Sequence, residues 1–309
     1  MVNPTATTNA TLAFSVIIGV YNDWSPLDHC LRSLAQQANA PAFEVIVVDD
    51  GSDQAAPDFI RKWAQSLRLT IDRQSHAGVS TARNRGIRIS KGAVLVFVDA
   101  DCKPQVDCLA ALASAISEFP QHNAFQFRLT GDCSGLVGRA EQLRLLTLQT
   151  HMLQPDGRIR YLNTAGFAIR RTRVDPTAGL FDPVALRGED TLLMVNLMQA
   201  GELPLFVPQA AVQHAVPLSV RQYLRKAVRS AYVEGKTYSI IASKGVRIRV
   251  TQQERWNMLK SMWKSSAQKT IGRPAWFVLT AKQTLQRAVS LYYRRFGRGS
   301  NSQAPAKLS

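Results

Sequence analysis

Nearly continuous apolar runs alternate with amphipathic stretches along the first third of the chain. The runs FSVIIGV (14–20), FEVIVV (43–48) and AVLVFV (93–98) are typical of parallel strands that are covered on both faces. The intervening stretches predict helices, the first with Ser25 as its N-cap and Pro26 as its first helical residue. This alternation of strands and helices predicts an open α/β sheet flanked by helices.

Beyond residue 120 the pattern is less regular. It predicts a strand at 124–131, a helix at 134–153, a pair of strands at 161–174, a helix at 188–201 and a short strand that reaches His214. No segment has about 18 consecutive apolar residues, so no membrane-spanning helix is expected.

The net charge of +16 belongs entirely to the end of the chain. Residues 1–217 contain 19 Lys and Arg against 20 acids, whereas residues 218–309 contain 19 against 2, so their net charges are −1 and +17. This asymmetry predicts a near-neutral α/β domain followed by a basic module for an anionic surface. We therefore expect a flexible leader at 1–13, the α/β domain at 14–217, a basic amphipathic helical extension at 218–296 and a disordered tail at 297–309.

The cysteines and the first residues of the sequence favour a cytoplasmic protein. Cys30, Cys102, Cys108 and Cys133 form no C-x-x-C pair and suit neither a disulfide scaffold nor a zinc site, so we expect free thiols. The first 13 residues have no basic segment and no long apolar segment, so no signal peptide is expected.

Four carboxylates follow predicted strands. Asp49 and Asp50 come after one strand, and Asp99 and Asp101 come after another. Ligands of open α/β sheets bind outside the carboxyl ends of the strands, so we expect the four acids to cluster there. In D-x-D on an extended segment the two side chains point the same way, and their oxygens suit Mg²⁺ or Mn²⁺. Each pair taken alone equally suits a turn.

Seven motifs in order, SVIIGVYND, VIVVDDGSD, HAGVSTARNRGI, VFVDADC, GFAIRR, LFDPVALRGEDTLL and VQHAVP, resemble the family 2 glycosyltransferases of GT-A fold. The resemblance covers about residues 14–217. It implies a catalytic domain with a Rossmann-like mixed sheet that moves a sugar from a nucleoside-diphosphate sugar to a hydroxyl acceptor, with inversion. It also implies a donor site formed by Val20, Tyr21, Asn22, Asp49, Asp50, Arg83, Asn84 and Asp99.

The resemblance further implies the catalytic groups. Asp190 is the expected base, with Glu189 as the second choice or as an acceptor contact. Asp101 is the expected ligand of Mg²⁺ or Mn²⁺, and His214 matches a position that sometimes adds a second ligand. Without the resemblance, the two acids could simply favour a helix N-terminus, and His214 could be an ordinary histidine.

The segment after the catalytic domain departs from the pattern of processive members. Their Q-x-x-R-W element is replaced by RKAVRSAY, in which Arg225 and Arg229 could contact diphosphate or acceptor but no Trp is present. A processive polymer synthase is therefore not expected. Arg83 could also make only a structural salt bridge.

The basic extension contains amphipathic stripes with Trp and Tyr. In one of them, Trp256, Leu259, Met262 and Trp263 are predicted to share a helix face, with Lys260 and Lys264 beside it. Such helices suit an anionic membrane surface, although the stripes could instead pack on the catalytic domain. Nucleic-acid binding is less favoured, because the extension contains no recognised sequence motif of a nucleic-acid-binding domain.

The favoured hypothesis is thus a glycosyltransferase that is peripheral at the inner face of the cytoplasmic membrane. UDP-sugar is the default donor, and a lipid-linked or cell-envelope glycan is the expected acceptor. A sugar nucleotidyltransferase is a weaker alternative, because GVYNDWSP lacks a Gly-rich loop ending in a basic residue. A non-catalytic binding module on a degenerate transferase fold is the other alternative.

Overall fold

The computed structural model describes residues 12–175, 177–184, 188–215, 218–243 and 251–296, with the backbone alone at 232–243 and 293–296. The predicted leader, except for residues 12 and 13, and the whole predicted tail at 297–309 lie outside the described residues. The boundary predicted at residue 217 falls between a strand that ends at His214 and a helix that begins at Val220.

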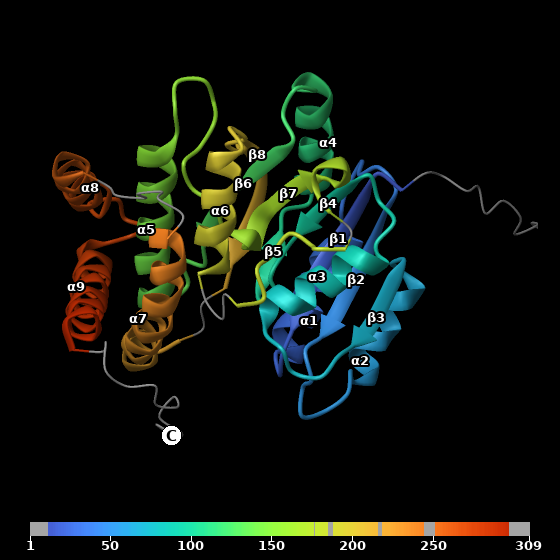
Figure 1. The fold of residues 1–309 in the computed structure, drawn as a ribbon, viewed down its shortest axis with the longest axis horizontal. Coiled ribbons are helices and arrows are strands. Elements are labelled where there is room, and N and C mark those ends of the chain that lie inside the picture. The colour runs from blue at the N-terminus through green and yellow to red at the C-terminus, as the bar shows by residue number, and fades with distance from the viewer. Residues whose placement is uncertain (1–11, 176, 185–187, 216–217, 244–250, 297–309) are drawn as a thin grey trace, which may run out of the picture.

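The described chain forms one mixed sheet of eight strands (Figure 1). Their order is β3-β2-β1-β4-β7-β6-β8-β5. The strands are β1 (Phe14–Val20), β2 (Phe43–Asp49), β3 (Leu69–Arg73), β4 (Val94–Phe97), β5 (Cys102–Pro104), β6 (Ala124–Gly131), β7 (Phe167–Arg170) and β8 (Leu205–His214). The first four neighbours are parallel, β7 is antiparallel to β4 and β6, β6 and β8 are parallel, and β5 is antiparallel to β8. The predicted α/β fold with a mixed sheet and C-terminal helices is confirmed.

Helices flank the sheet and continue beyond it. They are α1 (Trp24–Ala35), α2 (Asp58–Arg61), α3 (Val79–Ile89), α4 (Cys108–Glu118), α5 (Leu136–Met152), α6 (Glu189–Gln199), α7 (Val220–Ser243), α8 (Gln252–Ser265) and α9 (Arg273–Phe296). Short 3₁₀ turns lie at Lys62–Gln65, Thr164–Gly166 and Arg171–Arg173. In Figure 1, α8 and α9 lie at the end of the molecule opposite β3.

The apolar runs form a core on both faces of the sheet. In β1, Val16 and Ile18 join one buried cluster while Ile17 joins the other, as a period of two requires. Burial of each such side chain stabilises the fold by roughly 1.5–3 kcal/mol. A Cβ on Gly86 of α3 would lie 2.5 Å from Cγ2 of Ile17, so this glycine allows α3 to approach β1 closely.

Two local predictions are wrong. The first helix begins at Trp24 with Asp23 as its N-cap residue, and Ser25 has no capping role. Pro26 then lies within the first turn, where its missing N–H would have had no helical partner. Only residues 167–170 of the predicted strand pair at 161–174 are a strand, because the Asn163 side chain accepts a hydrogen bond from the Ala165 N–H and caps a 3₁₀ turn.

The helical extension packs on the rest of the chain through its apolar residues. Met262 of α8 and Ala275 and Leu279 of α9 are buried in one cluster with Ala140 and Leu143 of α5. The sequence left open whether the stripes pack in this way or face a membrane, and for these residues they pack. Within the described residues, no helix has the length and apolarity that crossing a membrane requires.

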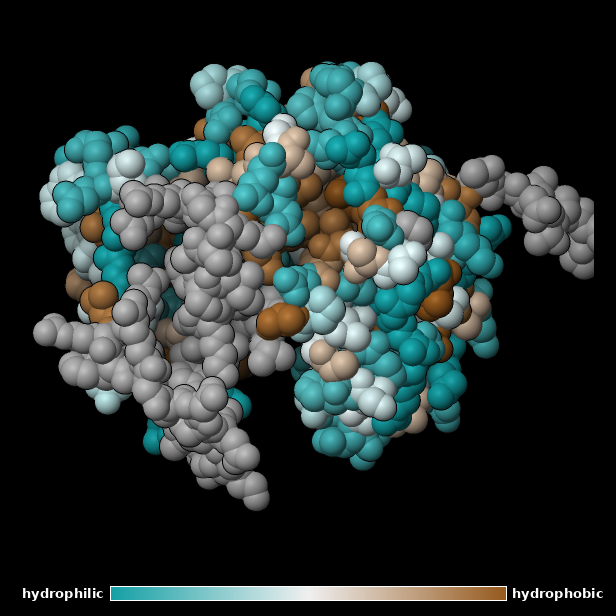
Figure 2. Space-filling view, viewed as in Figure 1, coloured by the Kyte–Doolittle hydropathy of each residue, from teal (hydrophilic) through white to brown (hydrophobic). Residues whose placement is uncertain are grey.

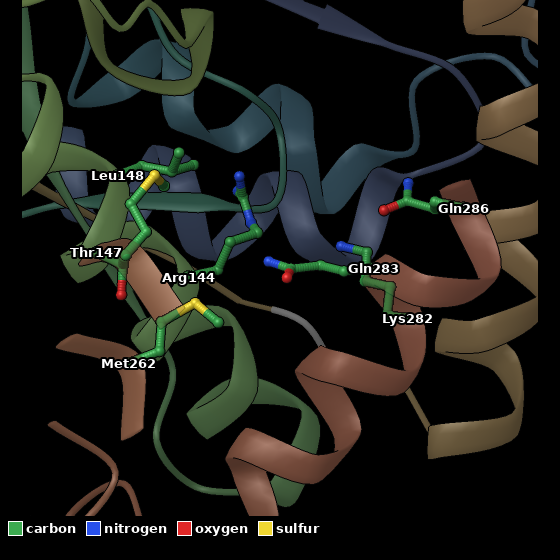
Figure 3. Close-up of a pocket in the computed structure, with 8 residues that line it drawn as sticks. Arg144, Thr147, Leu148, Met262, Lys282, Gln283 and Gln286 are labelled. Atoms are coloured by element: carbon green, nitrogen blue, oxygen red, sulfur yellow. The ribbon is translucent and has the colours of Figure 1, made fainter. Parts of the chain in front are cut away.

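A cavity of about 120 Å³ lies among α5, α8 and α9 (Figure 3). Arg144 and Lys282 line it, and both belong to an ion-pair cluster around the buried Glu141, which also accepts a hydrogen bond from the Tyr223 hydroxyl at 3.0 Å. The two cations are thus engaged within the protein. None of the acids at the strand ends lines this cavity.

Candidate active site

The turn after β2 holds the loop that leads into α3. Asp49 and Asp50 are both buried. Asp49 accepts a hydrogen bond from the Ser52 N–H at 2.8 Å, and Asp50 accepts from the N–H groups of Ala77 and Gly78, both at 2.9 Å. These carboxylates therefore fix the backbone of two segments that are 25 residues apart in sequence.

An exposed aromatic pair lies above this turn. The Tyr21 ring, which follows β1, stacks on the His76 ring with centroids 4.3 Å apart, and His76 Nδ1 is 2.9 Å from Asp50 Oδ2. Asn22 adopts a left-handed φ of 59° and exchanges two hydrogen bonds with Asp53. Val20 is buried, and its carbonyl accepts a hydrogen bond from the Asp50 N–H at 2.8 Å. The arrangement offers a flat, partly exposed surface for a planar ring.

The D-x-D segment is a turn, and the predicted extended conformation is wrong. The Cys102 N–H donates to the Asp99 carbonyl at 3.0 Å, which closes the turn between β4 and β5. The two side chains consequently face different partners. Asp99 Oδ1 accepts from Arg83 Nη2 at 2.7 Å, whereas Asp101 Oδ2 lies 3.2 Å from His214 Nε2. Pairing of β5 with β8, which sets Cys102 opposite His214, brings the second pair together.

Arg83 joins two acidic segments. Its guanidinium on α3 is 4% exposed and pairs with Asp99 and, at 2.9 Å, with Oε1 of Glu189 at the start of α6. Burial disfavours the charged form, but these two carboxylates keep the pKa of Arg83 above its usual range. The salt bridge that the sequence left open is therefore present, and both its partners are candidate site residues.

Asp190 is a partly buried acid with a strongly shifted pKa. Burial, followed by the charge of Glu189, raises its pKa to about 7. The Thr164 hydroxyl donates to Asp190 Oδ1 at 2.6 Å and opposes that shift. The buried Gln126 holds the Thr164–Gly166 turn in place, since its side chain accepts from the Asn163 N–H at 2.8 Å and donates to the Gly166 carbonyl at 2.8 Å. A carboxyl group that is half ionised near neutral pH is suited to accept a proton.

Asn84 has both ends of its carboxamide bound by the backbone that precedes α6. Its Oδ1 accepts from the N–H groups of Leu180 and Phe181 at 3.0 Å, and its Nδ2 donates to the Phe181 carbonyl at 2.6 Å. These bonds hold the Phe181 ring against Arg83, with the guanidinium 5.3 Å from the ring centroid. A Cβ on Gly179, whose φ is +79°, would lie 2.6 Å from Asn84 Oδ1, so a glycine is needed here.

Asp101, Cys102 and His214 offer ligand atoms that all lie within 4.8 Å of one another. A carboxylate oxygen and an imidazole nitrogen suit Mn²⁺, and such ions commonly leave further positions to water and phosphate oxygens. Burial raises the pKa of the Cys102 thiol well above its usual value, which disfavours its thiolate form. The residues present therefore fit a divalent ion held by Asp101 and His214.

Three site residues were not identified from the sequence. Burial and the charge of Asp101 raise the pKa of Asp23, and the charge of Lys226 partly opposes that rise. The Lys226 charge also contributes, after the hydrogen bond with His214, to the lowered pKa of Asp101. Lys226 of α7 is therefore within electrostatic range of the D-x-D turn. Arg225 and Arg229 are exposed on the same helix, and their predicted contacts stay a prediction. Asp23 directly follows the predicted Asn22 and could have been included. Thr164, the third, gives no recognisable signal in a single sequence.

Comparison with known proteins agrees with this arrangement. The model of the family described as Glycosyl transferase family 2 matches residues 15–176. The chain is 37% identical over 113 residues to "Glycosyltransferase AglE" of Haloferax volcanii. The aligned residues make up 35% of this chain and 37% of that protein. It is 38% identical over 108 residues to "PGL/p-HBAD biosynthesis glycosyltransferase" of Mycobacterium bovis, 34% of this chain and 42% of the relative. The chain thus spans less than half the length of these curated relatives.

Solved structures share the fold. Residues 1–349 of S. aureus TarS align with a TM-score of 0.56 at 19% identity, covering 92% of each chain. The mannosyltransferase PcManGT from Pyrobaculum calidifontis, in complex with GDP-Man and Mn²⁺, aligns with a TM-score of 0.59 at 17% identity, covering 92% of this chain and 87% of its own. The expected GT-A fold is confirmed. Because the family match spans more than half of the chain, this protein belongs to glycosyl transferase family 2.

Proposed function

We propose that the protein is an inverting glycosyltransferase that moves a sugar from a nucleoside-diphosphate sugar to a hydroxyl group. The observation that carries the proposal is Asp190, a partly buried carboxyl group with a pKa of about 7 that lies in electrostatic contact with the Arg83–Asp99 pair. A purely structural acid at a helix N-terminus would be expected to be ionised and solvated. A pKa near the working pH is what a general base needs.

The donor nucleotide would lie over the turns after β1 and β2. Tyr21 and His76 present a stacked, exposed platform for the base, with Val20 and Asn22 beside it. Asp49 and Asp50 shape this region through their hydrogen bonds to the loop. Asp99, two residues after β4, would contact the ribose. Asn84 acts by positioning Phe181 beneath Arg83, because its carboxamide is bound by the backbone.

The diphosphate would lie between the D-x-D turn and α7. When bound by Asp101 and His214, a divalent cation would offset the negative charge of the departing diphosphate. The UDP-bound form of S. aureus TarS and the Mn²⁺ of the PcManGT structure support a nucleotide and a metal in this fold. Lys226 would add positive charge on the α7 side, together with Arg225 and Arg229, for which contacts with diphosphate or acceptor were predicted from the sequence.

Asp190 would remove the proton from the acceptor hydroxyl as its oxygen attacks the anomeric carbon, and the bond from that carbon to the diphosphate oxygen would break. Glu189 is a poorer base, because its carboxylate is paired with Arg83. A single displacement of this kind inverts the anomeric centre and needs no second catalytic carboxylate. Arg83 would hold Asp99 and Glu189 in a fixed position relative to one another, through one bond from each of its terminal nitrogens.

UDP-sugar remains the first choice of donor, and GDP-sugar is the second. Solved neighbours are described in complex with UDP-GlcNAc and with GDP-Man. A lipid-linked or cell-envelope glycan is the proposed acceptor class.

Calorimetry with UDP and with GDP, in the presence and absence of Mn²⁺, tests the proposal. We expect binding of one nucleotide that depends on Mn²⁺ in the wild type and in Asp190→Asn, and that is lost in Asp101→Asn. Binding that is equally tight in Asp101→Asn would contradict the assignment of the metal ligand. Absence of any metal-dependent nucleotide binding in the wild type would favour a non-catalytic module.

A further inference from the structure

The outer surface of α8 and α9 concentrates exposed apolar residues. Among the large hydrophobic residues that are exposed in the described chain, five of twelve belong to these two helices: Trp256, Trp263, Phe277, Leu291 and Tyr292. Trp256 is 57% exposed and Phe277 is 60% exposed. Figure 2 shows brown apolar side chains among teal polar ones over this end of the molecule. Such a concentration marks an interaction surface.

These residues are not required to attach the helices to the protein. Met262, Ala275 and Leu279 already anchor α8 and α9 to α5 through their inner faces. The predicted stripe of α8 is divided accordingly, since Met262 is buried whereas Trp256 and Trp263 point outward. The outer aromatic residues therefore form a surface on a docked, preformed pair of helices.

Basic residues surround this surface almost without acidic ones. Exposed cations of the pair include Arg255, Lys260, Lys264, Lys269 and Arg287. Residues 251–296 contain one acid, Glu254, and its carboxylate is paired with Arg160 at 2.9 Å. The surface is thus complementary to a partner with a dense negative charge next to an apolar layer.

The aromatic rings suit a lipid interface better than nucleic-acid bases. The Arg273 guanidinium lies 3.7 Å over the Trp263 ring, and Trp276 meets that ring edge-on. Lys260 lies over the Trp256 ring at 5.7 Å. Stacking on a base requires a free ring face, and one face of each ring already has a cation over it. Insertion of ring edges and of Leu291 into the headgroup boundary needs no free face.

We propose that this surface, formed by Trp256, Lys260, Trp263, Lys264, Phe277 and Leu291, binds the interface of an anionic lipid bilayer. The rings and Leu291 enter the boundary between headgroups and acyl chains, while the two lysines contact lipid phosphates. Attachment does not require the extension to leave the rest of the chain. It is also independent of the catalytic proposal, because it requires neither donor nor acceptor.

Vesicle sedimentation of the full chain tests the proposal. We expect the protein to sediment with vesicles made of equal parts phosphatidylcholine and phosphatidylglycerol at low salt, and to remain in solution with phosphatidylcholine alone. Trp256→Ser combined with Phe277→Ser should weaken binding at least about tenfold, since two apolar side chains no longer enter the interface. Phe59→Ser, a matched change at a 42% exposed phenylalanine of α2, should leave binding unchanged.

Fluorescence provides a second measurement that does not depend on weakened binding. Phosphatidylcholine with brominated acyl chains, mixed with phosphatidylglycerol, should quench tryptophan emission, and Trp256→Phe with Trp263→Phe should remove most of that quenching while sedimentation persists. Absence of sedimentation, or equal sedimentation of the Ser variants and the wild type, would overturn the proposal. Binding of oligouridylate without binding of vesicles would overturn it in favour of nucleic acid. A stable dimer that the Trp256→Ser and Phe277→Ser changes dissociate, without vesicle binding, would overturn it in favour of self-association.

Discussion

Replacement of Thr164 by Val should move the pH dependence of the reaction while leaving the shape of the protein almost unchanged. The change removes the hydroxyl that donates to Asp190 Oδ1 at 2.6 Å. That hydrogen bond favours the ionised carboxylate, so its loss raises the pKa of Asp190 above its value of about 7.

The size of the effect follows from the strength of the bond. A hydrogen bond to a charged group contributes about 1.5–3 kcal/mol, which corresponds to about one to two pKa units. At pH 7 the ionised fraction of Asp190 would fall from about one half to between about one tenth and one hundredth, so kcat/KM should fall about 5- to 50-fold. At pH 9 the ionised form is largely restored, and the variant should come within about twofold of the wild type.

The assay is the rate of nucleoside-diphosphate release from a donor sugar between pH 5 and 10, as kcat/KM. The control is Thr147→Val, which removes another buried threonine hydroxyl, one that donates to the Leu143 carbonyl within α5 at 2.7 Å. We expect the control to keep the wild-type pH profile. A Thr164→Val profile that is unshifted, or that is lowered equally at every pH, would refute the assignment of Asp190 as the base.

Three further outcomes are expected. Arg83→Lys should lower kcat/KM about 10- to 100-fold, because one ammonium group cannot pair with Asp99 and Glu189 in the same geometry. The control Arg85→Lys affects the more exposed pair with Asp72 and should leave kcat/KM unchanged. Equal kinetics of the two variants would count against the bridging role of Arg83. His214→Gln should raise the Mn²⁺ concentration for half-maximal activity at least about tenfold relative to His122→Gln, and an unchanged requirement would remove His214 from the metal site. Gly179→Ala should lower the free energy of unfolding in urea by about 1–3 kcal/mol more than Gly201→Ala does. Both glycines have a positive φ, but only at residue 179 would the new Cβ meet Asn84. Equal losses of stability would show that the loop accommodates the Cβ.

Features encoded in contiguous sequence were predictable. The apolar runs that became β1, β2 and β4 required burial on both faces, and the acids after them had to lie at the carboxyl edge of the sheet. The E-D pair at the start of α6 was identified by resemblance, and the structure brings it to the Arg83–Asp99 pair. These features depend on local periodicity or on an ordered set of motifs.

Features that depend on contacts between distant residues were not predictable. Thr164 becomes important only because the buried Gln126, far from it in sequence, fixes the 3₁₀ turn that aims its hydroxyl at Asp190. The D-x-D segment was expected to be extended, but the hydrogen bond that closes its turn and the pairing of β5 with β8 direct Asp99 and Asp101 to different partners. A single sequence also gave no reason to separate the outward Trp256 from the buried Met262 on α8.

The most direct test of the central claim is the anomeric configuration of the sugar first released from an α-linked donor. A panel of UDP-, GDP- and dTDP-sugars can be incubated with the protein and Mn²⁺ while proton NMR follows the free sugar before it mutarotates. Inversion with Asp190 as the base predicts that the β-anomer appears first from one of these donors, and that Asp190→Asn releases almost none. First appearance of the α-anomer, or undiminished release by Asp190→Asn, would contradict it.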